Sequence, residues 1–220
     1  MIKCCVFDLD GTLLYTIPSI TYYINASFDK EGLPHITEED CRRFIGNGAS
    51  KLVERALVSV GAYSEEMHKR VLSDYNAAYD RDPYYLTEPY SGIRGLVDAL
   101  AARGIVLAVL SNKPDSTARL VTEHFFGDSF ASVRGGRSGV PLKPMPHSLL
   151  ELLHELSVLP SETAFIGDSD VDILTGKNAC TALTVGAAWG FRDREELVRA
   201  GADAVADTPK EAEEELLLRL

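Results

Sequence analysis

Aspartates in two widely separated segments could do phosphoryl-transfer chemistry. Asp8 and Asp10 lie near the N-terminus, and Asp168 and Asp172 lie close together much further along the chain. A carboxylate can attack phosphorus and form an aspartyl-phosphate. A phosphate and several carboxylates cannot share a site unless a cation neutralises them. Oxygen ligands without nearby His or Cys favour a hard metal, most plausibly Mg²⁺.

A hydroxyl and an ammonium complete this set. Ser111 lies in the segment Ser111-Asn112-Lys113, and Lys143 precedes Pro144. Fixed donors of this kind, together with backbone amides, can hold the oxygens of a transferring phosphoryl group. Taken singly, Ser111 could cap a helix and Lys143 could be a surface lysine. The coincidence of all four segments favours a functional site.

Other site types do not fit the sequence. The acidic triplet that begins at Asp168 lacks the glycine and glutamate that a calcium loop needs, since those positions hold Ile173 and Ala179. A P-loop has a glycine directly before its lysine, and no glycine adjoins Lys143. Ser111 lacks the flanking glycines of a hydrolase elbow. The five histidines show no metal-ligand spacing.

The elements that would position these residues alternate between strand and helix. Short apolar runs predict strands at residues 2–7, 105–110, 163–166, 181–185 and 203–206. Helical patterns occupy 115–125, 146–157, 171–179 and 193–200, and a final helix follows Pro209. This alternation predicts an α/β fold with a doubly wound parallel sheet. Ligands bind outside the carboxyl ends of such strands, so the four segments are expected to converge at one sheet edge.

Residues 15–88 break the alternation. Helical patterns at 18–31, 37–44, 48–60 and 64–80 follow one another with no convincing strand, and all nine tyrosines lie between Tyr15 and Tyr90. The sequence therefore predicts two domains. Residues 1–14 and 89–220 would form the α/β core, and 15–88 would form an inserted helical domain.

Charge and composition exclude several classes of protein. The net charge is −11, from 33 acidic and 22 basic residues, which argues against nucleic-acid binding and against docking on anionic membranes. No apolar run approaches the ~20 residues of a membrane span, and the N-terminus turns acidic too early for a secretory signal. The four cysteines form no Cys-x-x-Cys pair, which is typical of reduced thiols in a cytoplasmic protein.

The four segments resemble the ordered motifs of the haloacid dehalogenase-like hydrolases. The resemblance rests on Asp8-x-Asp10-Gly11-Thr12-Leu13, Ser111-Asn112-Lys113, Lys143-Pro144 and Gly167-Asp168-Ser169-x-x-Asp172, and it covers essentially the whole chain. The helical insertion resembles the small cap of that superfamily. The chain is most similar to its phosphoglycolate phosphatase-like branch, through residues 45–57, 189–192, 195–197 and 201–203. Tyr15 departs from the pattern, because relatives often carry an acid at this hinge of the cap.

The resemblance implies roles for individual residues. Asp8 would be the nucleophile, and Asp10 would protonate the leaving oxygen and then activate water. Mg²⁺ would be held by Asp8, the Asp10 carbonyl and Asp168. Phosphate would be bound by Ser111, Lys143 and the backbone near Asn112. Thr12 would position Asp10, and Asp172 would support the metal or orient Lys143. Three residues of the cap are candidates for reading the substrate: Arg43, Asn47 and Lys51.

The expected activity is Mg²⁺-dependent hydrolysis of a small phosphorylated metabolite, with phosphoglycolate first, by a monomer or weak homodimer. A sugar phosphomutase shares the same core and cap and remains an alternative. A dehalogenase is disfavoured because halide departure needs no acid at Asp10. A phospho-accepting receiver module also gathers acids, a hydroxyl and a lysine at a sheet edge. Such modules are shorter, and their acceptor lies on an interior strand of the chain rather than on the first strand.

Overall fold

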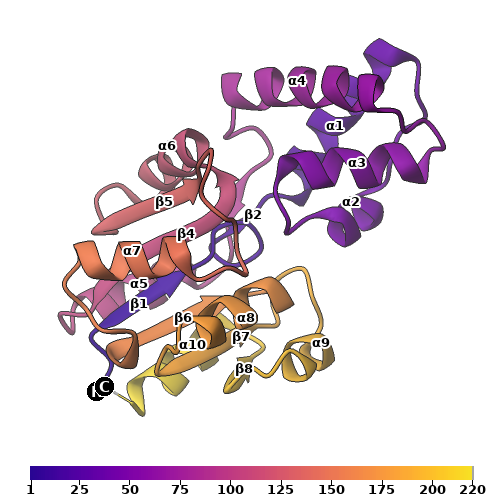
Figure 1. Cartoon of the computed structure of the whole chain (residues 1–220). Helices are drawn as coiled ribbons and strands as arrows, with labels where there is room; N and C mark the ends of the chain where they lie inside the picture. Colours follow the sequence, from indigo (N-terminus) through magenta and orange to yellow (C-terminus); the bar gives the residue numbers. More distant parts are fainter. Residues whose placement is uncertain (220) are drawn as a thin grey trace. The chain divides into compact units, whose positions relative to one another are not determined.

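Two compact units make up the part of the chain that the computed structural model describes, residues 1–219. The first contains Met1–Tyr15 and the chain from Pro89 onward, and the second is Thr16–Glu88. Figure 1 shows the helices and strands of each unit. No helix within residues 1–219 is both long enough and apolar enough to cross a membrane.

A six-stranded parallel sheet forms the centre of the first unit. Its strand order is β5-β4-β1-β6-β7-β8. The chain leaves β1, builds β4 and β5 on one side, and returns to build β6, β7 and β8 on the other. The order therefore reverses at β1, which confirms the predicted doubly wound α/β class and places the switch point at the carboxyl end of β1. The strands are β1 (Cys4–Phe7), β4 (Val106–Pro114), β5 (Ser132–Gly136), β6 (Thr163–Gly167), β7 (Leu183–Ala187) and β8 (Ala204–Ala206).

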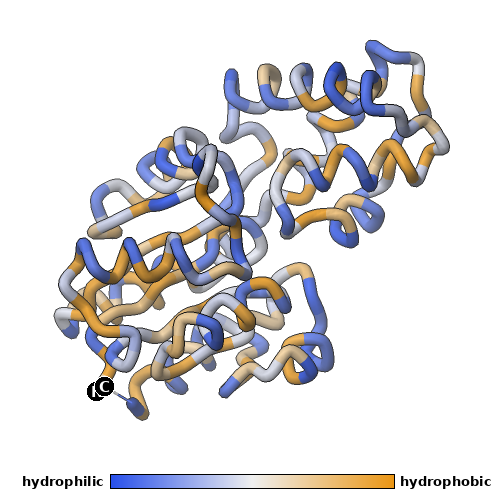
Figure 2. Tube along the Cα trace, in the orientation of Figure 1, coloured by the Kyte–Doolittle hydropathy of each residue, from blue (hydrophilic) through white to orange (hydrophobic). Residues whose placement is uncertain are grey.

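Side chains of β1 alternate between two buried layers. Cys4 and Val6 belong to a core cluster with Leu149, Leu152 and Leu153 of helix α7. Phe7 meets the ring of Phe130 edge to face, with ring centres 6.2 Å apart. Because successive strand residues point to opposite faces, the sheet is covered on both sides. Figure 2 shows the apolar character concentrated along the strands. The helices of this unit are α5 (Ile93–Ala101), α6 (Asp115–Phe126), α7 (His147–Glu155), α8 (Asp170–Asn178), α9 (Arg194–Arg199) and α10 (Pro209–Leu217), with a 3₁₀ turn at Pro160–Glu162.

Two strands of the six-stranded sheet differ most from the sequence prediction, and the two short strands outside it were not predicted. Strand β4 runs to Pro114 rather than to residue 110, so Ser111, Asn112 and Lys113 lie within it. Strand β5 was not predicted, because Ser-Val-Arg-Gly-Gly lacks the apolar run of a buried strand. Its pairing with β4 shifts register between Leu110 and Pro114. This irregularity falls at the site segment, where bulges commonly redirect side chains.

Four helices make up the second unit, and each agrees with a predicted helix: α1 (Ile17–Glu31), α2 (Glu38–Phe44), α3 (Ala49–Ser59) and α4 (Glu65–Arg81). Thr37 begins α2 with a capping box, accepting from the Asp40 amide while Asp40 accepts from the Thr37 amide. Gly32 ends α1 in the left-handed conformation, with φ 65°. Short strands β2 (Leu14–Tyr15) and β3 (Glu88–Pro89) pair where the chain leaves and rejoins the first unit. Tyr15 contacts the Tyr90 ring there, at 5.7 Å between centres.

Helix α7 offers a matched test of this core. Leu152 is fully buried in the cluster beneath β1, whereas Leu150, on the same helix, is 41% exposed. Leu152→Ala should lower the free energy of unfolding by about 2–5 kcal/mol, because it removes buried methyl groups and leaves a cavity. Leu150→Ala should change it by less than about 0.5 kcal/mol. Urea denaturation of the two variants measures the difference, and equal losses would contradict this packing.

Candidate active site

A tight loop after β1 carries the first two candidate aspartates. The Asp8 amide donates to the Ile166 carbonyl at 2.9 Å, which ties the start of the loop to β6. The chain then turns at Gly11, whose φ is +88°. A Cβ atom on Gly11 would lie 2.2 Å from Asp168 Oδ2, so both the turn and the close approach require glycine.

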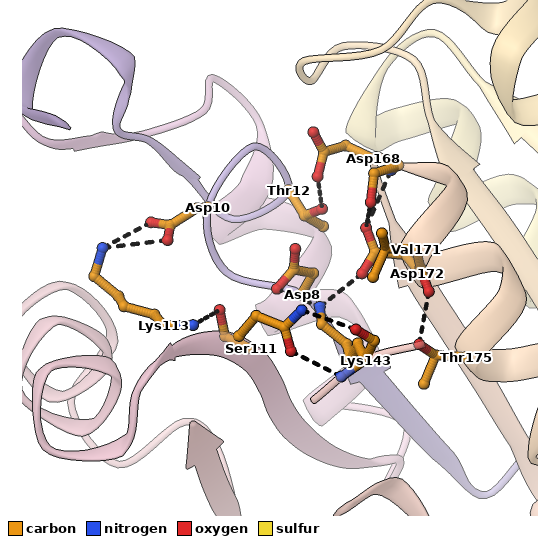
Figure 3. Close-up of polar contacts among 12 residues, drawn as sticks. Asp8, Asp10, Thr12, Ser111, Lys113, Lys143, Asp168, Val171, Asp172 and Thr175 are labelled. Carbon is orange, nitrogen blue, oxygen red and sulfur yellow. Dashed lines mark hydrogen bonds and ion pairs between the residues drawn. The ribbon is translucent and has the colours of Figure 1, made fainter. Parts of the chain in front are cut away.

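Lys143 lies between two carboxylates. Its Nζ is 2.8 Å from Asp8 Oδ1 and 2.6 Å from Asp172 Oδ1, and its side chain is 3% exposed. Burial acts to lower the pKa of Lys143, but the charges of Asp172 and Asp8 outweigh it and raise that pKa. Lys143 is therefore a permanent cation at neutral pH. Figure 3 shows it beside Asp8 and Asp172.

The side chain of Asn112 holds the backbone of Lys143. Its Nδ2 donates to the Lys143 carbonyl at 3.1 Å, and its Oδ1 accepts from the Lys143 amide at 2.9 Å. Lys143 lies in the loop before α7, where no helix fixes its backbone. The two hydrogen bonds from Asn112 therefore hold the backbone of Lys143 in place. The predicted phosphate contact near Asn112 would have to come from its backbone, since the carboxamide is engaged with Lys143.

Asp168 and Asp172 follow β6 and are each held by protein donors. Asp168 accepts from the Thr12 hydroxyl at 3.2 Å and from the Phe191 amide at 2.8 Å. Asp172 Oδ2 accepts from the amide and the hydroxyl of Ser169, at 3.0 and 2.6 Å. The Thr12 hydroxyl thus contacts Asp168, and its role in positioning Asp10 stays a prediction.

Three carboxylates converge closely enough to hold one cation. Oxygens of Asp8, Asp168 and Asp172 lie within 4.8 Å of one another, and all three residues are buried. Burial, followed by the charge of Asp172, raises the pKa of Asp8 to about 7. Burial and the charges of Asp172 and Asp8 also raise the pKa of Asp168 well above its usual value. Burial and the mutual repulsion of the carboxylates therefore both disfavour the ionised forms of Asp8 and Asp168.

The donor set fits a hard divalent cation. Asp8 Oδ1 meets Lys143 Nζ as an ion pair but lacks an aligned hydrogen bond, so this buried oxygen can still accept a cation. Asp168 would be the second ligand. Asp168 and Asp172 each have both carboxylate oxygens in hydrogen bonds, but of the two only Asp172 pairs with Lys143, which supports an orienting role for Asp172. The Asp10 carbonyl remains a predicted ligand.

Asp10 makes a separate ion pair. Its two carboxylate oxygens lie 3.1 and 3.2 Å from Lys113 Nζ. The Lys113 amide donates to the Ser111 hydroxyl oxygen at 3.3 Å. No role for Lys113 was predicted from the sequence, although it belongs to the Ser111-Asn112-Lys113 segment. The signal available was its place directly after Ser111-Asn112.

A loop after β7 also reaches the site and was given no role from the sequence. Trp189 Nε1 donates to the Thr12 carbonyl at 3.0 Å, and the Phe191 amide holds Asp168. Between them, Gly190 packs so closely that a Cβ would lie 2.3 Å from both the Asp168 Cβ and the Gly11 carbonyl oxygen. This loop therefore buttresses the Asp8–Thr12 loop and the Asp168 carboxylate together.

The three candidate substrate-reading residues have partners within the helical unit. Arg43 pairs with Asp40 at 2.7 Å, and Lys51 pairs with Glu54 at 2.8 Å. Asn47 Oδ1 accepts from an Arg55 guanidinium nitrogen at 2.8 Å. A role for Arg43, Asn47 or Lys51 in reading the substrate remains a prediction.

Buried aspartates and a lysine thus meet at the switch point of a doubly wound sheet, and the comparison with known proteins gives the class. The chain matches the haloacid dehalogenase-like hydrolase family over residues 5–185. It is 35% identical to the phosphoglycolate phosphatase of Rhodospirillum rubrum over 213 residues, which cover 94% of this chain and 88% of the relative. It is 32% identical to the phosphoglycolate phosphatase of Vibrio vulnificus (strain YJ016) over 212 residues, with 94% and 92% covered.

A solved structure shows the same likeness in three dimensions. The crystal structure of a protein from Lactobacillus delbrueckii subsp. bulgaricus superposes with a TM-score of 0.92 at 32% identity, covering 97% of this chain and 98% of the other. The chain therefore belongs to the haloacid dehalogenase-like hydrolases. Within that family it resembles the phosphoglycolate phosphatases.

The raised pKa values predict how stability depends on pH and metal. In the metal-free protein, burial and the charge of Asp172 raise the pKa of Asp8 to about 7, whereas the ordinary pKa of an aspartate in the unfolded chain is 3.8. The folded state therefore binds more protons across this range, and its stability falls as pH rises from about 4 to 7. Mg²⁺ binds ionised carboxylates, so it should raise the melting temperature more at pH 8 than at pH 5.5. Asp168→Asn, which removes one of the carboxylates, should weaken this effect. An equal Mg²⁺ effect at both pH values would contradict the assignment.

Gly190 offers a test of the buttressing loop. Gly190→Ala should push the loop away from Asp168 and lower metal affinity by about 10–100-fold, the usual effect of losing a contact to a metal ligand. Gly95→Ala is the matched control, because a Cβ at this site in α5 meets nothing within 4 Å. Isothermal titration calorimetry with Mg²⁺ compares the two. Unchanged affinity in Gly190→Ala would show that the loop does not position Asp168.

Proposed function

We propose that this protein is a Mg²⁺-dependent phosphatase that hydrolyses a small phosphate monoester, with phosphoglycolate as the favoured substrate. The observation that carries the proposal is the buried group of Asp8, Asp168, Asp172 and Lys143 at the sheet's switch point. Family membership and the names of the relatives support both the reaction class and the substrate.

Asp8 is the proposed nucleophile. An Asp8 carboxylate oxygen attacks phosphorus, the bond from phosphorus to the ester oxygen breaks, and an aspartyl-phosphate forms. The position of Asp8 supports this role, because it directly follows β1 at the carboxyl edge where ligands of such sheets bind. Lys143, 2.8 Å away, supplies a fixed positive charge for the phosphoryl oxygens. A bound Mg²⁺ would offset the repulsion between carboxylates and phosphate.

Ser111 is the proposed hydroxyl donor to the phosphoryl group. Its oxygen accepts from the Lys113 amide, so its own proton remains available to donate. Asp10 is the proposed acid and base. It gives a proton to the departing ester oxygen and then takes one from the water that attacks the aspartyl-phosphate, which releases phosphate and regenerates Asp8.

We also propose that residues 15–88 act as the cap domain of this enzyme, with residues 1–14 and 89–220 as its core. Closure of a cap during turnover would exclude bulk water and protect the phosphorylated aspartate. Arg43, Asn47 and Lys51 are the proposed candidates within the cap for recognising the non-phosphate end of the substrate.

A phosphate-release assay tests the function. The purified protein should release inorganic phosphate from phosphoglycolate faster than from other esters in a panel, and excess chelator should abolish release. Asp8→Asn should remove activity while retaining the fold, and Ser111→Ala should lower kcat by about 10²–10³-fold, the usual effect of losing one such donor.

Three outcomes would overturn parts of this proposal. Robust hydrolysis by Asp8→Asn would remove Asp8 as nucleophile, and full activity in chelator would remove the metal. Transfer of phosphate to another position on a sugar, without release, would indicate a phosphomutase.

A further inference from the structure

Two lysines pair with three of the four aspartates of the site. Lys143 pairs with Asp8 and Asp172, whereas Lys113 pairs with Asp10 through both carboxylate oxygens. Figure 3 shows Lys113 reaching toward Asp10 on the far side of Asp8 from Asp172. The Asp10 side chain is 15% exposed and that of Lys113 is 5% exposed. Lys113 is thus a nearly buried cation directed at one carboxylate.

The pairing of β1 and β4 brings the Lys113 ammonium close to the loop that follows β1. Strands β1 and β4 are parallel neighbours, and the β4–β5 register shifts between Leu110 and Pro114. Lys113 lies within that irregular stretch, and its amide contacts the Ser111 hydroxyl. One residue therefore touches both the proposed phosphate donor and the proposed acid.

Stability alone does not explain a buried lysine at this point. Desolvating an ammonium costs several kcal/mol, and replacing a buried ion pair by apolar side chains is often neutral or stabilising. The other carboxylates are held by different groups: Asp168 by Thr12 and Phe191, and Asp172 by Ser169 and Lys143. Lys113 holds the carboxylate of Asp10 in the same way.

We propose that Lys113 is a positioning residue that holds the Asp10 carboxyl group in the orientation needed for proton transfer to the leaving oxygen. This inference rests on the proposed function, in which Asp10 is the acid. A general acid must lie within hydrogen-bond reach of the oxygen that it protonates, and a misplacement of about 1 Å can cost about 10²-fold in rate. Without the ammonium, the Asp10 side chain loses its double contact and can rotate out of position.

Leaving-group dependence separates this role from a merely structural one. An alkyl ester such as phosphoglycolate needs its leaving oxygen protonated, whereas p-nitrophenolate departs readily without a proton. The quantity to compare is kcat/KM, because it covers the steps up to formation of the aspartyl-phosphate. Lys113→Met keeps the length of the side chain and removes its charge. It should lower kcat/KM for the alkyl ester by about 10–100-fold and for p-nitrophenyl phosphate by less than about threefold.

Three further variants control the experiment. Lys113→Arg keeps a cation and should restore most of the alkyl-ester activity. Lys210→Met removes a surface lysine that pairs with Glu213 in α10. It should leave kcat/KM unchanged for both substrates. If Lys113→Met melts at a lower temperature than the parent protein, Lys113→Gln provides a second neutral variant.

The outcomes distinguish the inference from the function on which it rests. Asp10→Asn, measured alongside, should show a larger leaving-group dependence than Lys113→Met. If Asp10→Asn affects both substrates equally, the proposed role of Asp10 fails. If Asp10→Asn discriminates between the substrates and the neutral Lys113 variants do not, the inference about Lys113 is overturned and the function stands.

Discussion

The burial of several carboxylates around a single ammonium is the constraint on which the rest of this site depends. Asp8, Asp168 and Asp172 lie within 4.8 Å of one another, and Lys143 is the cation between Asp8 and Asp172. Such a group is unfavourable in a dry interior, as the raised pKa values of Asp8 and Asp168 show. The surrounding fold must hold these charges together against their repulsion. The same imbalance makes the site receptive to a divalent cation.

The scaffold supplies this restraint mostly through backbone groups. Asp8 is tied to β6 by its amide, Asp168 is held by the Phe191 amide, and Lys143 is clamped through its own backbone by Asn112. These contacts join segments that are far apart in the sequence but adjacent at the sheet edge. The reversal of strand order at β1 brings them together, because the ends of β1, β4 and β6 are neighbours there.

The sequence was informative where chemistry follows local pattern. Apolar runs located β1 and β6, and helical periodicity located all four helices of the 16–88 unit. The expectation that the polar segments meet at one sheet edge agrees with the close approach of Asp8, Asp168 and Asp172 and with the pairing of Lys143. Strand β5 was not predicted, because an edge strand with Arg134 at its centre has no apolar run. The buried Arg134 side chain forms ion pairs with Glu151 and Glu155 of α7.

The contacts of Asn112, Lys113 and the Trp189 loop could not be predicted for a different reason. Each joins residues separated by tens to more than a hundred positions, and no local periodicity encodes such a pairing. Only the three-dimensional arrangement shows that the Thr12 hydroxyl contacts Asp168. Residue types therefore indicated the chemistry, whereas the supporting hydrogen bonds required the structure.

Trp189 is the single tryptophan of the chain, and its indole nitrogen donates to the carbonyl of Thr12 in the loop that follows β1. Indole emission responds to hydrogen bonding and to the polarity around the ring. The protein thus carries one intrinsic fluorophore that contacts the loop bearing Asp8, with no second indole to obscure the signal. Its emission gives an optical record of that loop in the native, unlabelled chain.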